Sequence, residues 1–345
     1  VEYIVGKMPK KRKTEATNKI SDGTANIIVG THALLEGDIK FKNLSLVVID
    51  EQHKFGVEQR LKMRKKVTLN SVQCKSADFL LMSATPIPRT LGLTLYGDLD
   101  ISTIRELPPG RVSIKTLEMF DKNAYNFVRE KIKKGEQAFI VYPLVDESEK
   151  LQLKSAVKEA QNLKETEFAN FVVGLIHGRL KPEEKDRIMS DFAQKKIDIL
   201  ISTTVIESGI DISNATVMVI EHAERYGLST LHQLRGRVGR GNKQSYCVLL
   251  SDARGGDPKK RLEVLLKTTD GFKIAEEDLK IRGYGEFFGT QQSGIVEFKI
   301  GDIVSDVEII SDAKVAAREI LKNEPQLATL LLSESQSNLL ELAGV

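Results

Sequence analysis

Short runs of apolar and β-branched residues recur along the chain up to about Ser251 and predict strands. The predicted strands are residues 27–29, 46–49, 79–82, 114–118, 137–142, 172–176, 197–201, 216–220 and 245–250. Helical patterns separate most of them, and strands that alternate with helices predict a parallel sheet. Residues 46–49 and 199–201 are continuously apolar, so we expect these strands to be covered on both faces.

Two helices between these strands have clear boundary signals. Asp121 is expected to cap the first helix, and Gly135 is expected to end it. The second helix begins at Lys181 and has Pro182 in its first turn. The predicted buried faces are Ala124, Tyr125, Val128 and Ile132 in the first helix and Ile188, Met189 and Phe192 in the second.

A change of pattern predicts the domain organisation. Residues 106–112, Glu-Leu-Pro-Pro-Gly-Arg-Val, form a stiff turn in which we place a boundary. After about Asp252 the strand signals stop, and the helical patterns are residues 259–269, 273–282, 305–322 and 326–342. We therefore predict an α/β protein with two parallel-sheet lobes, residues 1–108 and 109–252, and a helical C-terminal region, residues 253–345.

Composition excludes several classes of protein. The 345 residues are 41% hydrophobic and 29% charged, which argues against a disordered or coiled-coil chain. We expect neither a membrane span, which needs about 20 apolar residues, nor a secretion leader. Cys74 and Cys247 form no zinc or disulfide pattern and suit a reducing cytoplasm. The net charge of +3 does not indicate a nucleic-acid partner, so any basic track must be local.

Two adjacent carboxylates, Asp50 and Glu51, follow the apolar strand at residues 46–49, where parallel sheets bind ligands. Hydrolysis of a nucleoside triphosphate requires an acid that holds Mg²⁺ and a group that positions the attacking water. Asp50 suits the first task and Glu51 suits the second. The alternative is a strand that ends in a solvated acidic turn, and the apolar run and the Gln-His pair that flank these acids weigh against it.

A second signal lies in residues 233–240, Gln-Leu-Arg-Gly-Arg-Val-Gly-Arg. Arg235, Arg237 and Arg240 are separated by glycines and resemble a phosphate-facing helix start, where guanidinium groups stabilise a transferring phosphoryl group. The alternative is a solvated basic turn. A weaker signal, residues 202–211, offers hydroxyls and backbone N–H groups to a phosphate, but an ordinary strand-to-helix turn explains it equally well.

Taken in order, these segments resemble the motif series of the superfamily 2 helicases. The matching segments are Gly30-Thr31-His32, Asp50-Glu51-Gln52-His53, Ser83-Ala84-Thr85, Thr203…Gly209…Asp211 and Gln233…Gly236-Arg237…Gly239-Arg240. The resemblance covers residues 27 to about 251. It implies two RecA-like lobes with ATP in the cleft between them and nucleic acid across the top.

A narrower resemblance is to the RecG family of branch-migration helicases. It rests on residues 50–57, 83–91 and 270–283. The last stretch, running on to residues 289–294, resembles the translocation motif shared by RecG and the transcription-repair coupling factor Mfd. Gln52 favours RecG, because Mfd-like proteins usually carry Glu there. An Mfd-like translocase is the closest alternative, and a DNA-binding module without ATPase activity is another.

The resemblance implies a role for each residue that matches a motif. The residues implied in hydrolysis are Asp50, which holds Mg²⁺ through water, Glu51, which activates water, and Arg237 and Arg240, which meet the phosphates. The nucleotide-binding residues are Gln233, Gly209, Asp211 and His53. The coupling residues are Gln52, Ser83, Thr85, Gln291 and Gln292, and the residues toward the DNA backbone are Thr31, His32, His177 and Thr203. For His177, a packing role is an equal alternative.

One expected element has no match. Helicases of this kind need a Gly-rich loop that ends Gly-Lys-Ser/Thr, whereas Gly6-Lys7 is followed here by Met8. We expect the chain to begin after that loop, inside a truncated first lobe, and to lack ATPase activity by itself. The apolar side chains that the truncation would uncover include Val47, Ile49, Leu81 and Met82.

For the parent protein, the resemblance implies an ATP-dependent DNA helicase that remodels forks and Holliday junctions in recombination and repair. The implied cofactors are ATP and Mg²⁺. The implied partners are branched DNA and a single-strand-binding protein, with no membrane. The expected location is the bacterial cytoplasm, at the nucleoid.

A basic run near the start resembles a nuclear localisation signal. It consists of residues 9–13, Pro-Lys-Lys-Arg-Lys. Pro9 can begin a helix that runs to about Ile20, so we interpret the charges as its solvent face. A local contact with phosphate is the alternative.

Overall fold

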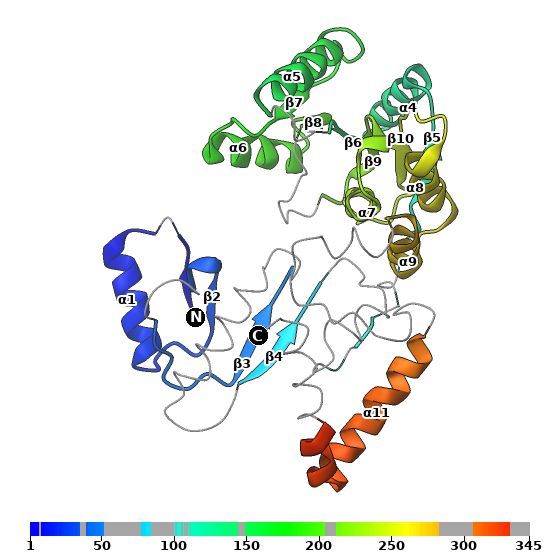
Figure 1. Cartoon of the computed structure of the whole chain (residues 1–345). Coiled ribbons are helices and arrows are strands. Elements are labelled where there is room, and N and C mark those ends of the chain that lie inside the picture. The colour runs from blue at the N-terminus through cyan, green and yellow to red at the C-terminus, as the bar shows by residue number, and fades with distance from the viewer. Residues whose placement is uncertain are drawn as a thin grey trace. The chain divides into compact units, whose positions relative to one another are not determined.

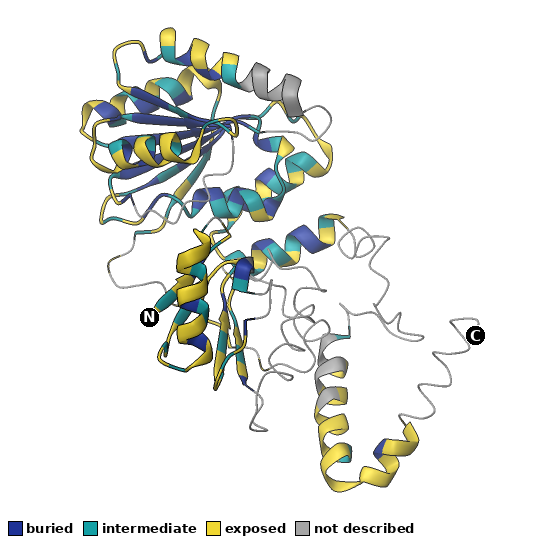
Figure 2. Cartoon of the chain, turned by 90° about the vertical axis from the view of Figure 1, so that its left-hand side faces the viewer, coloured by how far each residue is buried: buried dark blue, intermediate teal, exposed yellow. Residues whose placement is uncertain are grey.

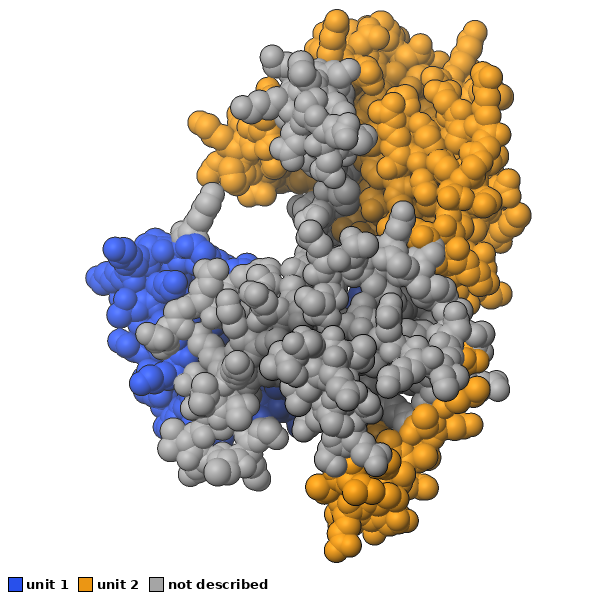
Figure 3. Space-filling view, in the orientation of Figure 1, with its two compact units in different colours: residues 1–84 blue, residues 85–345 orange. Residues whose placement is uncertain are grey.

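The computed structural model describes residues 1–6, 8–34, 39–51, 77–83, 112–143, 149–203, 212–282 and 306–331, with a few single positions between 100 and 110. The chain divides into two compact units, residues 1–84 and residues 85–345 (Figure 3). The predicted boundary between residues 108 and 109 stays a prediction, because most of residues 84–111 lie outside the described ranges.

The larger unit is built on a parallel sheet (Figure 1). Its six strands lie in the order β5-β10-β9-β6-β8-β7, and all neighbouring pairs are parallel. The strands are β5 (Lys115–Glu118), β6 (Gln137–Val141), β7 (Val173–Ile176), β8 (Ile199–Ser202), β9 (Ala215–Ile220) and β10 (Tyr246–Leu249). Each lies close to a predicted strand, so the prediction of a parallel α/β lobe is confirmed.

Helices cover both faces of this sheet, because alternate side chains of a strand point to opposite faces. Ala138 and Ile140 of β6 enter a core with α4 and α5, whereas Phe139 and Val141 enter a core with α6, α7, α8 and α9. The helices are α4 (Asp121–Lys133), α5 (Glu149–Glu165), α6 (Pro182–Ala193), α7 (Leu228–Arg235), α8 (Gly256–Lys267) and α9 (Gly271–Arg282). β6, β8 and β9 are buried along their whole lengths (Figure 2), which confirms for β8 the expected cover on both faces.

The helix boundaries agree with the sequence signals except at one cap. Phe120 occupies the N-cap of α4 without a side-chain hydrogen bond, so the prediction that Asp121 caps the helix is wrong. Asp121 is instead the first helical residue, where its charge suits the positive end of the helix dipole. Gly135 follows α4 with φ +76°, as expected of a helix-ending glycine. In α6 the backbone N–H of Lys181 donates to Glu184 Oε2 at 3.0 Å.

The predicted buried faces of these two helices are confirmed in their main residues. Ala124, Val128 and Ile132 of α4 are buried, and Tyr125 packs against the same core while half-buried. The buried and partly buried residues of α6 are Met189, Phe192 and Ile188.

The smaller unit holds two separate pairs of parallel strands, β1–β2 and β3–β4. Its elements are β1 (Glu2–Ile4), α1 (Lys10–Ser21), β2 (Ile28–Gly30), the short 3-10 helix η1 (His32–Leu34), β3 (Leu46–Ile49) and β4 (Asp78–Leu81). The predicted helix that begins after Pro9 is confirmed, whereas β1 was not predicted. A small core joins α1 to β1 and η1 through Ile4, Ala16, Ile20 and Ala33.

Several strand residues of this unit are exposed. Leu46 and Val48 are 54% and 51% exposed, so β3 is not covered on both faces as predicted. Met82 is exposed, in agreement with the expectation of uncovered apolar side chains, but Ile49 is buried, so that expectation is wrong for Ile49. The exposed residues alternate with less exposed neighbours, which places them on one face of the β3–β4 pair.

The predicted C-terminal helices are present where the structure describes them. α8 and α9 match two predicted helices, and α11 (Val307–Asn323) matches a third. Residues 325–331 form a further helical stretch, and the rest of the fourth predicted helix lies outside the described residues. No helix in the described part of the chain has the length and apolar character of a membrane span.

Candidate functional site

The acidic pair lies directly after β3, at the carboxyl end of a parallel strand. Asp50 Oδ1 accepts a hydrogen bond from the backbone N–H of Glu51 at 2.8 Å. Glu51 has φ +50°, a left-handed conformation that is uncommon for a residue other than glycine and costs about 1–3 kcal/mol. The buried Ile49 anchors the end of the strand. Packing and this hydrogen bond thus hold the two carboxylates in a sharp, strained turn.

Ser83 reaches the same sheet edge from the neighbouring strand. Ile49 pairs with Leu81, and the backbone N–H of Met82 donates to the Ile49 carbonyl at 2.8 Å. Because the strands are parallel, Ser83 follows β4 opposite the turn that carries Glu51. The structure therefore brings together three predicted site residues, namely Asp50, Glu51 and Ser83.

Asp50 fits a magnesium ion that is held mainly by a nucleotide. Mg²⁺ in phosphate-transfer sites usually takes one or two protein carboxylates, substrate phosphate oxygens and water. Across the described ranges, no group of three or more His, Cys, Asp or Glu side chains is arranged to hold a metal by itself. Asp50, a single carboxylate at the end of β3, is a sufficient protein ligand for a magnesium ion whose other ligands are nucleotide phosphates and water.

In the larger unit, His177 and Thr203 follow the neighbouring strands β7 and β8. Ile176 and Ser202 are register partners, so the two polar residues lie side by side at the carboxyl edge of the sheet. Thr203 is 1% exposed, and within the described part of the chain neither Thr203 Oγ1 nor His177 Nδ1 has a hydrogen-bond partner although both atoms are buried. Burial, followed by the charge of Arg179, lowers the pKa of His177, so its ring is neutral at pH 7.

Adjacent buried polar atoms without partners are unusual in a folded protein. A bound ligand that approaches this edge and offers complementary oxygens would satisfy both of them. The sequence predicts a DNA contact for both residues, with packing as the equal alternative for His177, and these roles stay predictions.

The arginine segment follows α7, which three buried leucines seat on the sheet. Val238 is fully buried, and Gly239 has φ +77°. A Cβ atom on Gly239 would lie 2.7 Å from Cγ1 of Ile114, so this close turn requires glycine. Val238 and Gly239 lie between Arg237, which is half-buried, and Arg240, which is exposed. Gln233 is half-buried on α7.

Arg235 does not share this arrangement, and the prediction that it faces a phosphate is wrong. It is 2% exposed, and its Nη1 donates to the carbonyls of Leu265 at 3.0 Å and Thr268 at 2.9 Å. Its Nη2 donates to Nδ1 of His232 at 3.0 Å. Burial lowers the pKa of His232 to about 4, so the ring is neutral and accepts this bond. Arg235 therefore ties α7 to the last turn of α8.

The other end of α7 is attached to α9. Gly227 precedes α7, and the guanidinium group of Arg282 lies against it, in the space that a Cβ atom would occupy. Arg282 in turn donates to the buried Asp278 at 3.0 Å. These contacts make α7, α8 and α9 one packed block behind the arginine segment.

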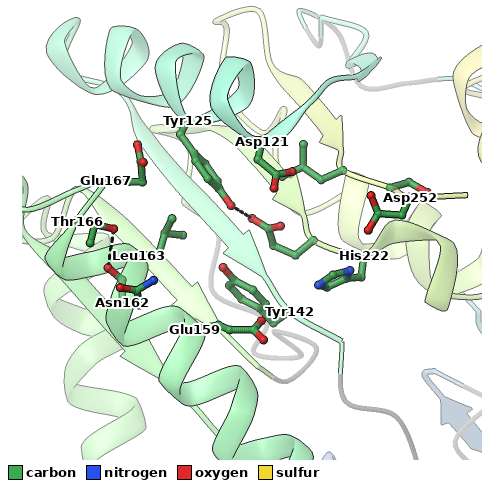
Figure 4. Close-up of a pocket in the computed structure, with 13 residues that line it drawn as sticks. Asp121, Tyr125, Tyr142, Glu159, Asn162, Leu163, Thr166, Glu167, His222 and Asp252 are labelled. Atoms are coloured by element: carbon green, nitrogen blue, oxygen red, sulfur yellow. Dashed lines mark hydrogen bonds between the residues drawn. The ribbon is translucent and has the colours of Figure 1, made fainter.

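An acidic cavity of about 320 Å³ lies at the carboxyl ends of β6, β9 and β10, beside α4 and α5 (Figure 4). Its lining includes Asp121, Tyr125, Tyr142, Glu159, Asn162, Thr166, Glu167, Glu221, His222 and Asp252. Tyr125 Oη donates to Glu221 Oε1 at 2.8 Å, and burial raises the pKa of Glu221 to about 7. Five of the lining residues are acidic, which disfavours the binding of a free triphosphate there.

Sequence reasoning named no residue of this cavity as functional. Glu221 directly follows a buried strand, the same position that marked Asp50. It lacks a second carboxylate beside it, which is why the pattern did not single it out.

The remaining predicted site residues lie outside the described residues. They are Gln52, His53, Thr85, Gly209, Asp211, Gln291 and Gln292. For His32 only the backbone, in η1, is described, and Thr31 directly follows β2. The roles of all of these residues stay predictions.

Three family models match the chain. The DEAD/DEAH box helicase model matches residues 1–93, and the helicase conserved C-terminal domain matches residues 120–242. The model of domain 3, C-terminal, of ATP-dependent DNA helicase RecG matches residues 268–332. The three matched ranges follow one another along the chain without overlap.

Individual relatives agree with these matches. The chain is 48% identical over 330 residues to the ATP-dependent DNA helicase RecG of Synechocystis sp., which covers 95% of this chain and 39% of the relative. It is 43% identical over 339 residues to the Bacillus subtilis protein of that name, which covers 96% of this chain and 48% of the relative. The chain therefore spans less than half the length of these relatives.

A solved structure of RecG bound to a three-way DNA junction matches with a TM-score of 0.66 and 44% identity, over 90% of this chain and 39% of that one. The helicase MrfA bound to DNA matches at 17% identity with a TM-score of 0.56, which supports the fold alone. The sequence identity, the family models and the matching solved structure agree, and we conclude that this chain belongs to the RecG family of superfamily 2 helicases.

Proposed function

We propose that the protein is an ATP-dependent DNA helicase that remodels forks and Holliday junctions in recombination and repair. The observation that carries the proposal is the similarity to the structure of RecG bound to a three-way DNA junction. The acidic pair and the arginine segment have side chains that suit phosphate chemistry. The match of residues 268–332 to the RecG domain favours this function over an Mfd-like translocase.

ATP and Mg²⁺ are the proposed cofactors. Mg²⁺ neutralises charge on the phosphates when it is bound. Asp50 would hold the ion through water, and Glu51 would orient the attacking water and accept its proton. Arg237 and Arg240 would stabilise the charge on the transferring phosphoryl group, a task suited to guanidinium groups at the end of a well-anchored helix. Gln233, Gly209, Asp211 and His53 would bind the nucleotide.

The proposed DNA contacts lie at the carboxyl edges of the sheets. Thr203 Oγ1 can donate to a phosphate oxygen, which would give this buried hydroxyl the partner that it lacks among the described residues. His177 lies beside it, on the neighbouring strand end. Thr31 and His32 follow β2 in the smaller unit and are proposed to contact a DNA backbone as well.

Coupling residues would transmit hydrolysis to DNA movement. Ser83 suits this role because it lies at the sheet edge that carries Glu51. Thr85 and Gln52 follow these elements in sequence, and Gln291 and Gln292 follow the block of α7, α8 and α9. The wider proposal includes branched DNA and a single-strand-binding protein as partners and the bacterial nucleoid as the place of action.

The test is a Glu51→Gln variant of the full-length protein. This change keeps the size of the side chain and removes the carboxylate, so DNA-stimulated ATP hydrolysis and fork unwinding should fall at least about 10²-fold. Glu130→Gln, an exposed acid on α4, is the matched control and should retain both activities. Near-normal turnover by Glu51→Gln would contradict the proposal.

A further inference from the structure

The N-terminal turn of α1 carries four consecutive cations, Lys10, Lys11, Arg12 and Lys13. The first three are exposed, and Lys13 is half-buried. Arg12 lies over the ring of Tyr3 at 4.8 Å, a cation–π contact that orients its guanidinium group. The surface is therefore a compact basic patch, although the chain as a whole is nearly neutral.

One acidic residue of α1, Glu15, lies one turn after Lys11 and Arg12. The first turn itself contains no acidic residue, and the N-cap, Pro9, makes no side-chain hydrogen bond. A nearby carboxylate, Glu2, pairs with Lys19 at 2.6 Å. Cations at the positive end of a helix dipole, with like charges one turn apart, lower helix stability by a few tenths of a kcal/mol for each pair. A bound polyanion would relieve both effects.

The topology places the patch beside a proposed DNA contact. β1 and β2 are parallel, Ile4 pairs with Gly30, and the backbone N–H of Thr31 donates to the Ile4 carbonyl at 3.3 Å. The chain leaves the carboxyl end of β1 and enters α1 a few residues later, so the first turn of α1 and Thr31 follow neighbouring strand ends. The patch thus extends the sheet edge at which the motif residues begin.

We propose that Lys10, Lys11 and Arg12 form an additional contact for the phosphate backbone of duplex DNA, next to Thr31 and outside the helicase motifs. The inference rests on the proposed function. Charge complementarity and continuity with the Thr31 edge favour DNA over an acidic protein segment. The proposed contacts are from Lys and Arg to phosphate oxygens, and such contacts carry no base specificity. It adds salt-dependent affinity and holds the duplex close to the smaller unit.

The experiment measures the salt dependence of DNA binding by the full-length protein. Lys10→Gln/Lys11→Gln is compared with Lys133→Gln/Lys134→Gln, an adjacent exposed lysine pair at the end of α4, on the opposite, amino-terminal edge of its sheet. Glutamine preserves helix propensity, and circular dichroism verifies the fold. The probes are a three-way junction and a plain duplex, each at several salt concentrations.

In a plot of log affinity against log salt concentration, each lost phosphate contact should make the slope shallower by about 0.9. The slope of the Lys10→Gln/Lys11→Gln variant should therefore be shallower than that of the wild type by about 2 on both probes. The α4 pair should retain the wild-type slope. Lys10→Glu/Lys11→Glu should weaken binding further. An α1 pair that binds with the wild-type slope, while the wild-type protein binds both probes, overturns this inference alone. A wild-type protein that binds neither probe overturns the proposed function as well.

Discussion

Arg235→Met should destabilise the larger unit while it leaves Arg237 and Arg240, the proposed phosphate contacts, in place. The buried guanidinium group of Arg235 donates to the carbonyls of Leu265 and Thr268 at the end of α8. Methionine fills much of the same volume but donates nothing. Two carbonyls then remain buried without the donor that the wild-type helix end relies on.

The magnitude follows from the lost bonds. Hydrogen bonds to a charged group contribute about 1.5–3 kcal/mol each, so the loss of two costs about 3 kcal/mol or more. Removal of a buried charge offsets part of this, since burial already lowers the pKa of Arg235. For a domain of this size, about 3 kcal/mol corresponds to a fall in Tm of roughly 6–12 °C.

Thermal unfolding and ATPase assays of the full-length protein test this reasoning together. Arg240→Met is the matched control, because Arg240 is exposed; it should unfold at the wild-type temperature and lose most of its ATPase activity. Arg235→Met should show the opposite result, namely a large fall in Tm and a smaller loss of ATPase activity. Wild-type Tm in Arg235→Met would refute the assignment of this residue to the α7–α8 joint.

Three further results are expected. The pKa of Glu221 is raised from 4.5 to about 7, so between these pH values the folded state holds a proton that the unfolded state releases. The free energy of unfolding should therefore fall as the pH rises from about 4.5 to 7. Glu221→Gln keeps an acceptor for Tyr125 and should raise the Tm at pH 8 but not at pH 4. Thr203→Val should leave stability unchanged or higher and weaken DNA binding several-fold by filter binding, whereas unchanged affinity would remove Thr203 from the DNA edge. Gly239→Ala should lower both the Tm and the rate of ATP turnover, because the added Cβ atom would press against Ile114. A fully active variant would show that this turn does not position Arg240.

Much of the fold was predictable because its signals are local. A buried parallel strand is a short apolar run, and β8 and β9 have this pattern along their whole lengths. The stop of α4 at Gly135 needs only a left-handed residue, which glycine adopts without strain. Asp50 and Glu51 could be predicted as site residues for the same reason, because the apolar strand before them and the Gln-His pair after them are adjacent in sequence.

The order of the strands required the folded chain. β10 lies between β5 and β9, and β6 lies between β9 and β8, although these strands are far apart in sequence. Apolar runs predict that strands exist and that they are buried, but each run can pair with any other. The choice depends on how the covering helices pack on the two faces, which is a property of the assembled core.

The three arginines in residues 235–240 show which properties follow from the sequence and which follow from the tertiary structure. In the sequence, Arg235, Arg237 and Arg240 are equivalent members of one basic segment. In the structure, the carbonyl acceptors of Arg235 come from α8, 30 and 33 residues farther along, whereas Arg240 remains at the surface. The sequence by itself determined that three arginines lie close together at the end of α7 and directly after it. Only the tertiary structure decided which of them is buried, because desolvation and hydrogen-bond partners depend on segments that meet in space.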